Sequence, residues 1–210
     1  AFVEEITRIT RQFFGDIDIK LRMQTKTVNA YYLNLPEICG QIVMRGLGIV
    51  PGKKPIINCG VPKLYLELAK SKQSEDILAN FLSWIFSGDG WLTLFTDHLG
   101  QKHRVLGLGF AVDVTGDSHV LPKLLTDCAY ILKTAFDISY NGPFVTSRYT
   151  YIDRGGKLKR SGAYGIHIQS YETLKIFKEK IGFPHSDKRN SLKLERALAS
   201  YKNKKRCDGR

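Results

Sequence analysis

Asp89 is the residue whose surroundings best suit metal chemistry. It lies near the end of the segment LSWIFSGDG (Leu82–Gly90), and the residues before it, ILANF, continue a helix. Gly88 and Gly90 are expected to end this helix, which places the Asp89 carboxylate at its final turn. Two such carboxylates facing one another would bind Mg²⁺ or Mn²⁺ through oxygen ligands, and these ions assist phosphodiester hydrolysis. A bare Gly-Asp-Gly is more often a simple helix stop before a strand.

Ser83 and Ser87 form a face of small residues on the same helix. They are one helical turn apart, and Gly88 lies beside them. Small residues at this spacing let two helix backbones approach closely, as they do between membrane helices. We therefore expect Ser83 and Ser87 to lie at a seam with a second helix, whose own acid would meet Asp89.

Long polar side chains alternate with apolar ones in the strand-like segment IKLRMQTK. Lys20, Arg22, Gln24 and Lys26 occupy every second position, so they share one face of a sheet. Such a face neutralises phosphates and reads base edges in the DNA major groove, although an ordinary solvated face is the alternative. The same theme predicts DNA contacts at Lys102, Arg104, Arg148, Thr150, Arg154, Lys157, Lys159 and Arg160.

The elements that position these residues recur along the chain. Near the start, a helix-like stretch leads into FFGDIDI, YYLNL and RGLGIVPGKK, and near the end LLTDCAYILKTAF leads into DISY, YGIHI and IGFPHSDK. In both copies Lys follows Gly by the same interval, Gly48 to Lys54 and Gly182 to Lys188. The shared order of helix, strand, strand and helix indicates a duplication.

The two copies are unequal, and their difference predicts the domains. A further helix, SEDILANFLSWIFS, and two strand-like runs, WLTLFTD and HRVLGLGFAVDV, precede the late copy. We predict an α+β fold in which a complete αββαββα unit with an antiparallel sheet follows a partial copy of itself. The predicted ranges are 1–66 for the partial unit, 67–77 for a linker, 78–200 for the complete unit and 201–210 for a basic tail.

The charge of the chain suggests a polyanionic partner. Among 210 residues, 32 Lys+Arg against 20 Asp+Glu give a formal net charge of +12, which favours nucleic acid or an acidic membrane face. No apolar run reaches the roughly 18 residues of a membrane span, and AFVEEITRIT lacks the apolar core of a signal peptide. The cysteines lie far apart, so we expect reduced thiols, no structural zinc and an intracellular location, in the cytoplasm or nucleoid.

The segment Leu82–Gly90 resembles, position for position, the signature motif of the LAGLIDADG homing endonucleases. The αββαββα layout is also that of one half of this family, whose saddle-shaped sheet lies in the DNA major groove. The passage from GIVPGKK into VPKLYLELAKSKQSEDILANF is similar to the family's passage between halves. The resemblance covers nearly the whole chain. It implies a site-specific endonuclease of intron homing that cuts double-stranded DNA at a long target by metal-dependent phosphodiester hydrolysis.

The resemblance also implies roles for individual residues. Asp89 would hold Mg²⁺ or Mn²⁺ at the scissile phosphate, with the backbone carbonyl of Gly88 as a further ligand. Lys188 and its repeat partner Lys54 would stabilise the developing charge. For each lysine, a contact to phosphate or to solvent is an equally strong alternative.

The chain departs from the family pattern at three places. Trp84 stands where the family prefers Gly, and Ser87 replaces the first acid of the motif. At the end of a strand, where many members carry a Gln that orients water, the chain has VDVTGD, so Asp113 or Thr115 would have to serve.

The chain holds one motif helix where the family uses two. The second would come from a homodimer mate or from an N-terminal segment absent from this sequence. Two other functions fit the same scaffold: an intron RNA-splicing maturase, which needs no metal chemistry, and a catalytically inactive DNA-binding protein.

Overall fold

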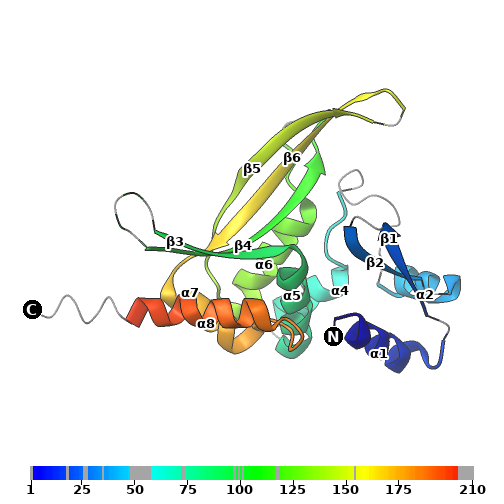
Figure 1. Ribbon diagram of the computed structural model, residues 1–210, viewed down its shortest axis with the longest axis horizontal. Helices are drawn as coiled ribbons and strands as arrows, with labels where there is room; N and C mark the ends of the chain where they lie inside the picture. Colours follow the sequence, from blue (N-terminus) through cyan, green and yellow to red (C-terminus); the bar gives the residue numbers. More distant parts are fainter. Residues whose placement is uncertain are drawn as a thin grey trace, which may run out of the picture. The chain divides into compact units, whose positions relative to one another are not determined.

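The computed structural model describes residues 2–17, 19–25, 28–34, 36–47, 58–71, 74–96, 98, 100, 102–116, 119–153 and 155–202. The chain divides into two compact units, Ala1–Pro51 and Gly52–Arg210. Figure 1 shows the two units in chain order, the first in blue.

The first unit follows the predicted order of helix, strand, strand and helix. It consists of α1 (Phe2–Phe14), β1 (Lys20–Thr25), β2 (Val28–Asn34) and α2 (Glu37–Leu47). Gly15 ends α1, because its φ of 80° is one that glycine adopts readily and its N–H donates to the carbonyl of Arg11 at 2.8 Å. The two strands are antiparallel, with Lys20 opposite Asn34.

The second unit contains the predicted αββαββα order, from α5 to α7. The α+β class and the antiparallel sheet are therefore confirmed. A short helix, α4, precedes this set, and a π-helical segment, η1, and a long helix, α8, follow it. The bounds are α4 (Lys63–Ser71), α5 (Glu75–Asp89), β3 (Gly90–Thr96), β4 (Lys102–Asp113), α6 (Lys123–Phe136), β5 (Asn141–Ile152), β6 (Leu158–Ile168), α7 (Tyr171–Ile176), η1 (Phe177–Ile181) and α8 (Lys188–Lys202).

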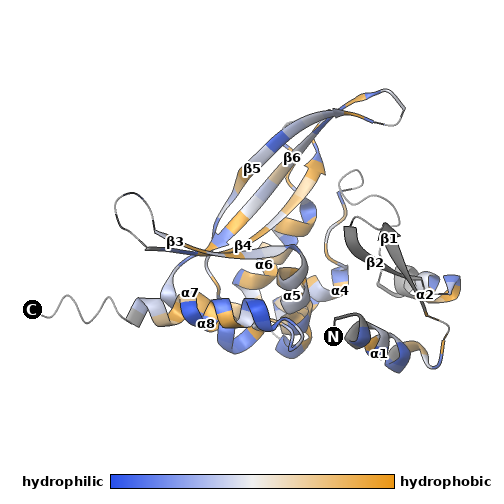
Figure 2. Cartoon of the chain, viewed as in Figure 1, coloured by the Kyte–Doolittle hydropathy of each residue, from blue (hydrophilic) through white to orange (hydrophobic). Residues whose placement is uncertain are grey.

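The sheet of the second unit has one face against the helices and one open face. Its order is β3-β4-β6-β5, and Leu106 of β4 lies between Leu92 of β3 and Ile168 of β6. Because successive side chains alternate between faces, the residues in step with Leu106 point toward the helices. Figure 2 shows hydrophobic residues along β6 and the helices, whereas β5 is mostly hydrophilic. The core includes Leu78, Leu82, Phe86, Leu106, Leu108, Leu125, Ile131, Leu132, Ile166, Ile168, Leu174 and Phe177.

The segment before α4 is fastened to α6. The carboxylate of Asp127 accepts hydrogen bonds from the Val61 N–H at 2.9 Å and from Lys123 Nζ at 2.8 Å. Asn58 accepts a bond from the Lys123 N–H at 2.7 Å and donates one to the Leu121 carbonyl at 3.0 Å. This segment therefore belongs to the second unit.

The boundary between the units differs from the one we predicted. The compact units divide between Pro51 and Gly52, not after residue 66. The predicted linker, 67–77, is largely helical, since α4 and α5 occupy most of it and α4 packs on α5 and α6. The apolar positions of α4, such as the fully buried Ala69, explain why this stretch joins the core.

The hairpin of β5 and β6 extends beyond the helices (Figure 1). Every residue of β5 except Phe144 is exposed, whereas β6 is buried from Ser161 onward apart from the half-buried Ala163 and His167. The far end of the hairpin is thus a two-stranded arm with both faces open to solvent.

Candidate functional site at the end of helix α5

Gly90 allows helix α5 to pass directly into strand β3. Its backbone is extended, with φ −90° and ψ 166°, and its N–H donates to the Phe86 carbonyl. A Cβ at this position would overlap the Phe86 carbonyl oxygen and lie 3.1 Å from that of Gly107. Asp89 is consequently the last helical residue, at the junction of helix and sheet, and its side chain is exposed. The predicted place of Asp89 at the helix end is confirmed.

A hydrogen bond joins the end of α5 to the start of α8. The Ser87 hydroxyl donates to Asp187 Oδ2 at 2.7 Å. Asp187 also caps α8, because its Oδ1 accepts the Asn190 N–H at 3.1 Å. Lys188 is the first residue of α8 and is exposed. Asp89 is the second residue after Ser87, and Lys188 is the residue after Asp187, so both candidate residues follow shortly after two side chains that are in contact.

The oxygen atoms at the end of α5 are suited to a hard cation. The last carbonyls of a helix have no partner within it, and they form the negative end of its dipole. The Gly88 carbonyl is among them, next to the Asp89 carboxylate, and a cation there would relieve the repulsion between these groups. Among the described residues, no three His, Cys, Asp or Glu side chains gather into a metal site. A cation at Asp89 would therefore need further oxygen ligands from elsewhere.

The pKa of the Cys128 thiol, in α6, is affected by the charges near the end of α5. Burial raises the pKa of its thiol far above the ordinary value, and the carboxylates of Asp127 and Asp89 raise it further. The thiol is consequently an inert core group. Cys39, Cys59 and Cys128, the described cysteines, are unpaired thiols.

Ser83 and Ser87, which we expected at a seam with a second helix, lie inside the second unit. Ser83 is 5% exposed, and Ser87 is bound to Asp187, so this face of α5 packs within the chain's own second unit. The spacing of four residues identified a common face but not the element that covers it. The exposed side of α5 carries Asn80 and Gly88 instead, with the half-buried Trp84 between them.

Arg104, a predicted DNA contact, lies on the helix side of the sheet and not on its open face. It is in step with Leu106, on the helix side of the sheet, and is only 8% exposed. Its Nε donates to the Ser200 hydroxyl at 2.6 Å, its Nη2 donates to the Ser200 carbonyl at 2.9 Å, and its guanidinium lies 3.9 Å from the centre of the Tyr201 ring. Arg104 therefore binds the C-terminal end of α8, where a cation is favoured by the helix dipole.

The basic residues of the β5–β6 hairpin are split between two faces. Arg148 lies opposite Gly162, and Thr150 lies opposite Arg160, which places these three polar residues on the helix-side face. The prediction that they share the open face is wrong, because Lys159 alternates with Arg160 and takes the other side. Arg148, Thr150 and Arg160 are exposed nonetheless, since no helix covers this end of the hairpin.

Lys159 is on the open face but is engaged. Its Nζ lies 3.3 Å from Oδ2 of Asp113, and both side chains are largely buried. The pKa of Asp113 is lowered, first by its hydrogen bonds from Thr115 and then by Lys159. Thr115 in turn accepts the Arg160 N–H at 2.9 Å. These residues fasten the end of β4 to β6.

Asp113 and Thr115 are poorly placed to orient water at Asp89. Gly90 pairs with Leu108, and Asp113 lies five residues farther along β4, a distance of about 17 Å along a strand. The expected water-orienting role is therefore not supported for either residue.

Several predicted positions lie outside the described residues: Lys26, Lys54 and Arg154. The structure describes the backbone of four further predicted residues: Lys20, Arg22, Gln24 and Lys102. Lys20 and Arg22 stand opposite Asn34 and Tyr32 in the first unit, with a register shift between Met23 and Thr25, and Lys102 pairs with Thr96 in the second. Lys157 is exposed in the turn between β5 and β6, where its N–H donates to Asp153.

The open face carries an aromatic cluster that we did not predict. Trp91 and Phe144 both make edge-to-face contacts with His167, at ring-centre distances of 5.7 and 4.3 Å. Phe95 stacks on His103, its partner across β3 and β4, at 4.7 Å. The period-two run Trp91, Thr93, Phe95 was the signal for this cluster.

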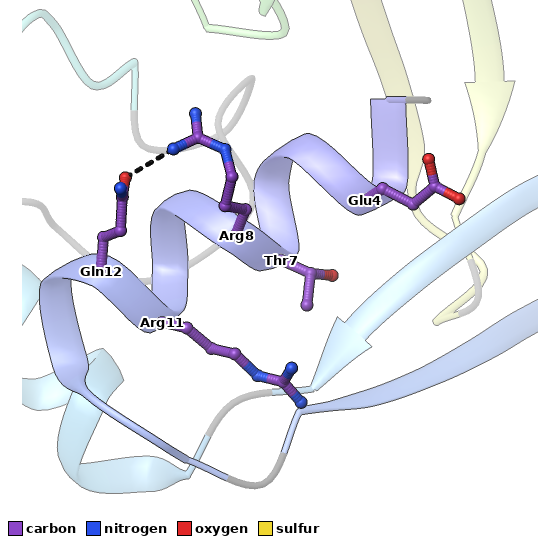
Figure 3. Close-up of a pocket in the computed structure, with 5 residues that line it drawn as sticks. All are labelled: Glu4, Thr7, Arg8, Arg11 and Gln12. Carbon is purple, nitrogen blue, oxygen red and sulfur yellow. Dashed lines mark hydrogen bonds between the residues drawn. The ribbon is translucent and has the colours of Figure 1, made fainter.

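A separate hollow of about 540 Å³ lies beside helix α1 of the first unit. Figure 3 shows the side chains that line it: Glu4, Thr7, Arg8, Arg11 and Gln12. Arg8 donates to Gln12 Oε1 at 2.8 Å. These lining residues include two cations and a single acid, so they suit contact with an anion better than metal chemistry.

Comparison with known proteins adds no relative. No family model matches the chain, and no curated protein matches it. Within the part of the chain that the structure describes, no helix has both the length and the apolar character that crossing a membrane requires.

Proposed function

We propose that this chain is a site-specific endonuclease of the LAGLIDADG type, which cleaves double-stranded DNA by metal-dependent phosphodiester hydrolysis. The observation that carries the proposal is the 2.7 Å hydrogen bond between Ser87 and Asp187. It fastens the helix that ends in an exposed carboxylate, Asp89, to the helix that begins with an exposed lysine, Lys188. Phosphoryl chemistry uses a metal-binding carboxylate together with an anion-stabilising cation, and the two joined helix ends present one of each.

The residues at the end of α5 fit a divalent ion such as Mg²⁺ or Mn²⁺. Asp89 and the Gly88 carbonyl would hold it, and it would supply Lewis-acid stabilisation of the phosphate. Lys188 would balance charge that develops on the phosphate oxygens. The net charge of +12 supports a polyanionic substrate.

A second carboxylate is required to complete this site. The exposed side of α5, with Asn80 and Gly88, offers a second helix room to approach, since a Cβ on Gly88 would meet nothing within 4 Å. A second copy of this chain, or a segment outside this sequence, would supply that helix and its acid.

Selection followed by cleavage tests the proposal. Duplexes bound by the full chain are first recovered from a randomised library in EDTA, and they are then incubated with the protein and Mg²⁺. Wild type should cut the selected duplex. Asp89→Asn should bind it with a similar Kd but cut it at least about 10²-fold more slowly.

Matched variants separate the site from the general charge of the protein. Asp76→Asn removes an exposed acid from the first turn of the same helix and should leave cutting unchanged. Lys188→Ala should slow cutting by roughly 10²-fold. Equal cutting by wild type and Asp89→Asn would remove the metal role, and specific duplex binding without cutting by wild type would favour the inactive DNA-binding protein.

A further inference from the structure

Strand β5 forms a long outer edge of the second unit's sheet. The strand order β3-β4-β6-β5 places it outermost (Figure 1), and in the part of the chain that the structure describes it pairs with β6 alone. An edge strand presents a row of N–H and C=O groups that can pair with a further strand, and proteins commonly keep such edges very short. β5 has 12 residues, so its outer row offers room for a whole added strand.

Two hydrogen bonds show which backbone groups of β5 face outward. The Asp153 N–H donates to the Lys157 carbonyl at 2.9 Å, so the residues in step with Asp153 bond to β6. The Arg160 carbonyl accepts the Val114 N–H at 2.9 Å on the other side of β6, so Arg160 does not bond to Thr150, its partner on β5. Both observations assign the bonds between these strands to the odd-numbered residues of β5.

The even-numbered residues Arg148, Thr150 and Ile152 therefore direct their N–H and C=O groups toward the outer edge. Bulges and prolines protect many natural edges from further pairing. In β5 both register shifts lie before Ser147, as does Pro143, and the register with β6 is regular from Ser147 to Ile152. The second half of β5 thus lacks these protective features.

The side chains along this edge differ between the two faces of the arm. Tyr149 and Tyr151 stand on the open face, where they are 50% and 45% exposed. Arg148 and Thr150 stand on the reverse face, with Arg160 opposite Thr150 on β6, and all three are exposed. A strand added to β5 would place alternate side chains beside the tyrosines and beside the arginines.

The charge of the arm selects the kind of strand that fits. Residues 141–168, the β5–β6 hairpin, contain five Lys or Arg residues and one acid, Asp153. The β5 strand of a second copy would bring the same positive charge to the edge, and like charges on neighbouring strands repel. A strand in which apolar and acidic residues alternate would match both faces at once, with apolar side chains on the tyrosines and carboxylates near Arg148 and Arg160.

We propose that the outer edge of β5, from Arg148 to Ile152, binds an extended acidic segment of a partner protein as a further antiparallel strand. Main-chain hydrogen bonds to this edge would supply affinity, and the alternation of side chains would supply specificity. This inference goes beyond the proposed function. It uses the edge of the sheet, not its open face, and it does not depend on Asp89 or on a metal ion.

Two peptide probes test this proposal in fluorescence anisotropy with the full chain in EDTA. The first is an end-blocked, labelled peptide of about seven residues, the length of an ordinary strand, in which Glu alternates with Val. The second has Lys in place of every Glu. The Glu peptide should bind, and its affinity should fall as salt rises, whereas the Lys peptide should bind far more weakly. Asp89→Asn should bind the Glu peptide as wild type does.

Thr150→Pro removes an N–H that faces solvent, so the arm should fold as before. Its affinity for the Glu peptide should fall by at least about tenfold, because a main-chain bond is lost and the ring blocks the edge. Thr150→Ala keeps the N–H and is the matched control. Arg148→Glu should weaken binding of the Glu peptide and strengthen binding of the Lys peptide, and this exchange tests the proposal even if Thr150→Pro unfolds the arm.

Hydrogen exchange of the backbone amides locates the added strand directly. The Glu peptide should slow exchange at Arg148, Thr150 and Ile152, and it should leave Tyr149 and Tyr151 unchanged, since these two already bond to β6. Equal binding of the two peptides would overturn the proposal, as would full affinity in a folded Thr150→Pro protein. If wild type without peptide self-associates and Thr150→Pro abolishes the association, the edge belongs to a second copy and the proposal fails.

Discussion

The hydroxyl of Ser87, in the last turn of α5, donates to the Asp187 carboxylate that caps α8. The same Oδ2 atom accepts a second bond from the Asn190 side chain at 2.8 Å. Both side chains are only partly exposed, so the bond between Ser87 and Asp187 couples two helices that lie far apart in the sequence.

This bond predicts coupled losses of stability. Ser87→Ala should lower the free energy of unfolding by about 1 kcal/mol, and Asp187→Ala, which also removes a cap, by about 2 kcal/mol. The two losses should fall short of additivity by roughly 1 kcal/mol in a urea double-mutant cycle. Ser170→Ala, which removes the cap of α7, should add independently to Ser87→Ala. Full additivity between Ser87 and Asp187 would mean that the bond does not couple the helices.

Arg104 should behave as a structural residue. Arg104→Ala removes the bonds to Ser200 and the stacking on Tyr201, and we expect a loss of about 2–3 kcal/mol in urea unfolding. Arg148→Ala, on the exposed arm, should change stability by no more than about 0.5 kcal/mol. The salt dependence of nucleic-acid binding separates the roles further, because Arg148→Ala should remove a bond to phosphate and so flatten the slope. A stable Arg104→Ala protein with weakened DNA binding would restore the DNA-contact interpretation.

Gly107 should not tolerate a methyl group. Because a Cβ there would overlap the Trp91 indole, Gly107→Ala should cost about 1–3 kcal/mol and displace the ring. Tryptophan emission in a Trp84→Phe background would report the displacement as a red shift. Gly116→Ala is the control, since its Cβ would meet nothing within 4 Å. An unshifted Gly107→Ala spectrum would show that the Trp91 indole does not lie over Gly107.

His167 should make stability depend on pH. Burial lowers its pKa below the ordinary value of 6.5, so the folded state takes up a proton less readily than the unfolded chain. Neutral His167 therefore makes its full contribution to the free energy of unfolding above pH 6.5, and this contribution is lost as the pH falls through the lowered pKa. Urea midpoints should drop more between pH 7.5 and pH 5.5 for wild type than for His167→Gln. Identical drops would show that the protonation of His167 does not contribute.

Gly88 should control how closely a second helix approaches. Gly88→Leu fits the open space beside α5, so its fold and unfolding midpoint should be close to those of wild type. If the active species pairs two helices through this face, the variant should lose cleavage and, for a homodimer, show the monomer mass in sedimentation on DNA. Gly88→Ala, which adds one methyl group, is the matched control. It should retain more of the cleavage activity and, for a homodimer, more of the dimer on DNA. Normal cleavage by Gly88→Leu would place the second helix elsewhere.

The order of the elements was predictable because it depends on local patterns. The alternation in HRVLGLGFAVDV and the helix stop at SGDG specify a strand and a junction on their own, and both are found. Asp89 at the helix end follows from the same local rule.

The faces of the sheet were not predictable in the same way. Period two groups Arg104 with Leu106 and Leu108, but this grouping does not say which side the helices cover, and a basic residue ordinarily points outward. The partner of Ser87 lies 100 residues away, and no spacing in the sequence reveals such a pair. The close packing of the Trp91 ring on the sheet likewise needs Gly107 and Gly109 of β4 and Gly165 of β6 at once.

The anchoring of Asn58 and Val61 to α6 has a consequence for how this unit could be inherited or transplanted. A fragment cut at the predicted boundaries, before residue 67 or 78, would leave the Asp127 carboxylate without the Val61 N–H and would discard part or all of α4. A fragment that starts at residue 58 keeps every one of these bonds. A gene fusion or a recombination event that preserves the αββαββα unit should therefore include the segment from residue 58 onward. Residue 58 is the better junction for building chimeric proteins.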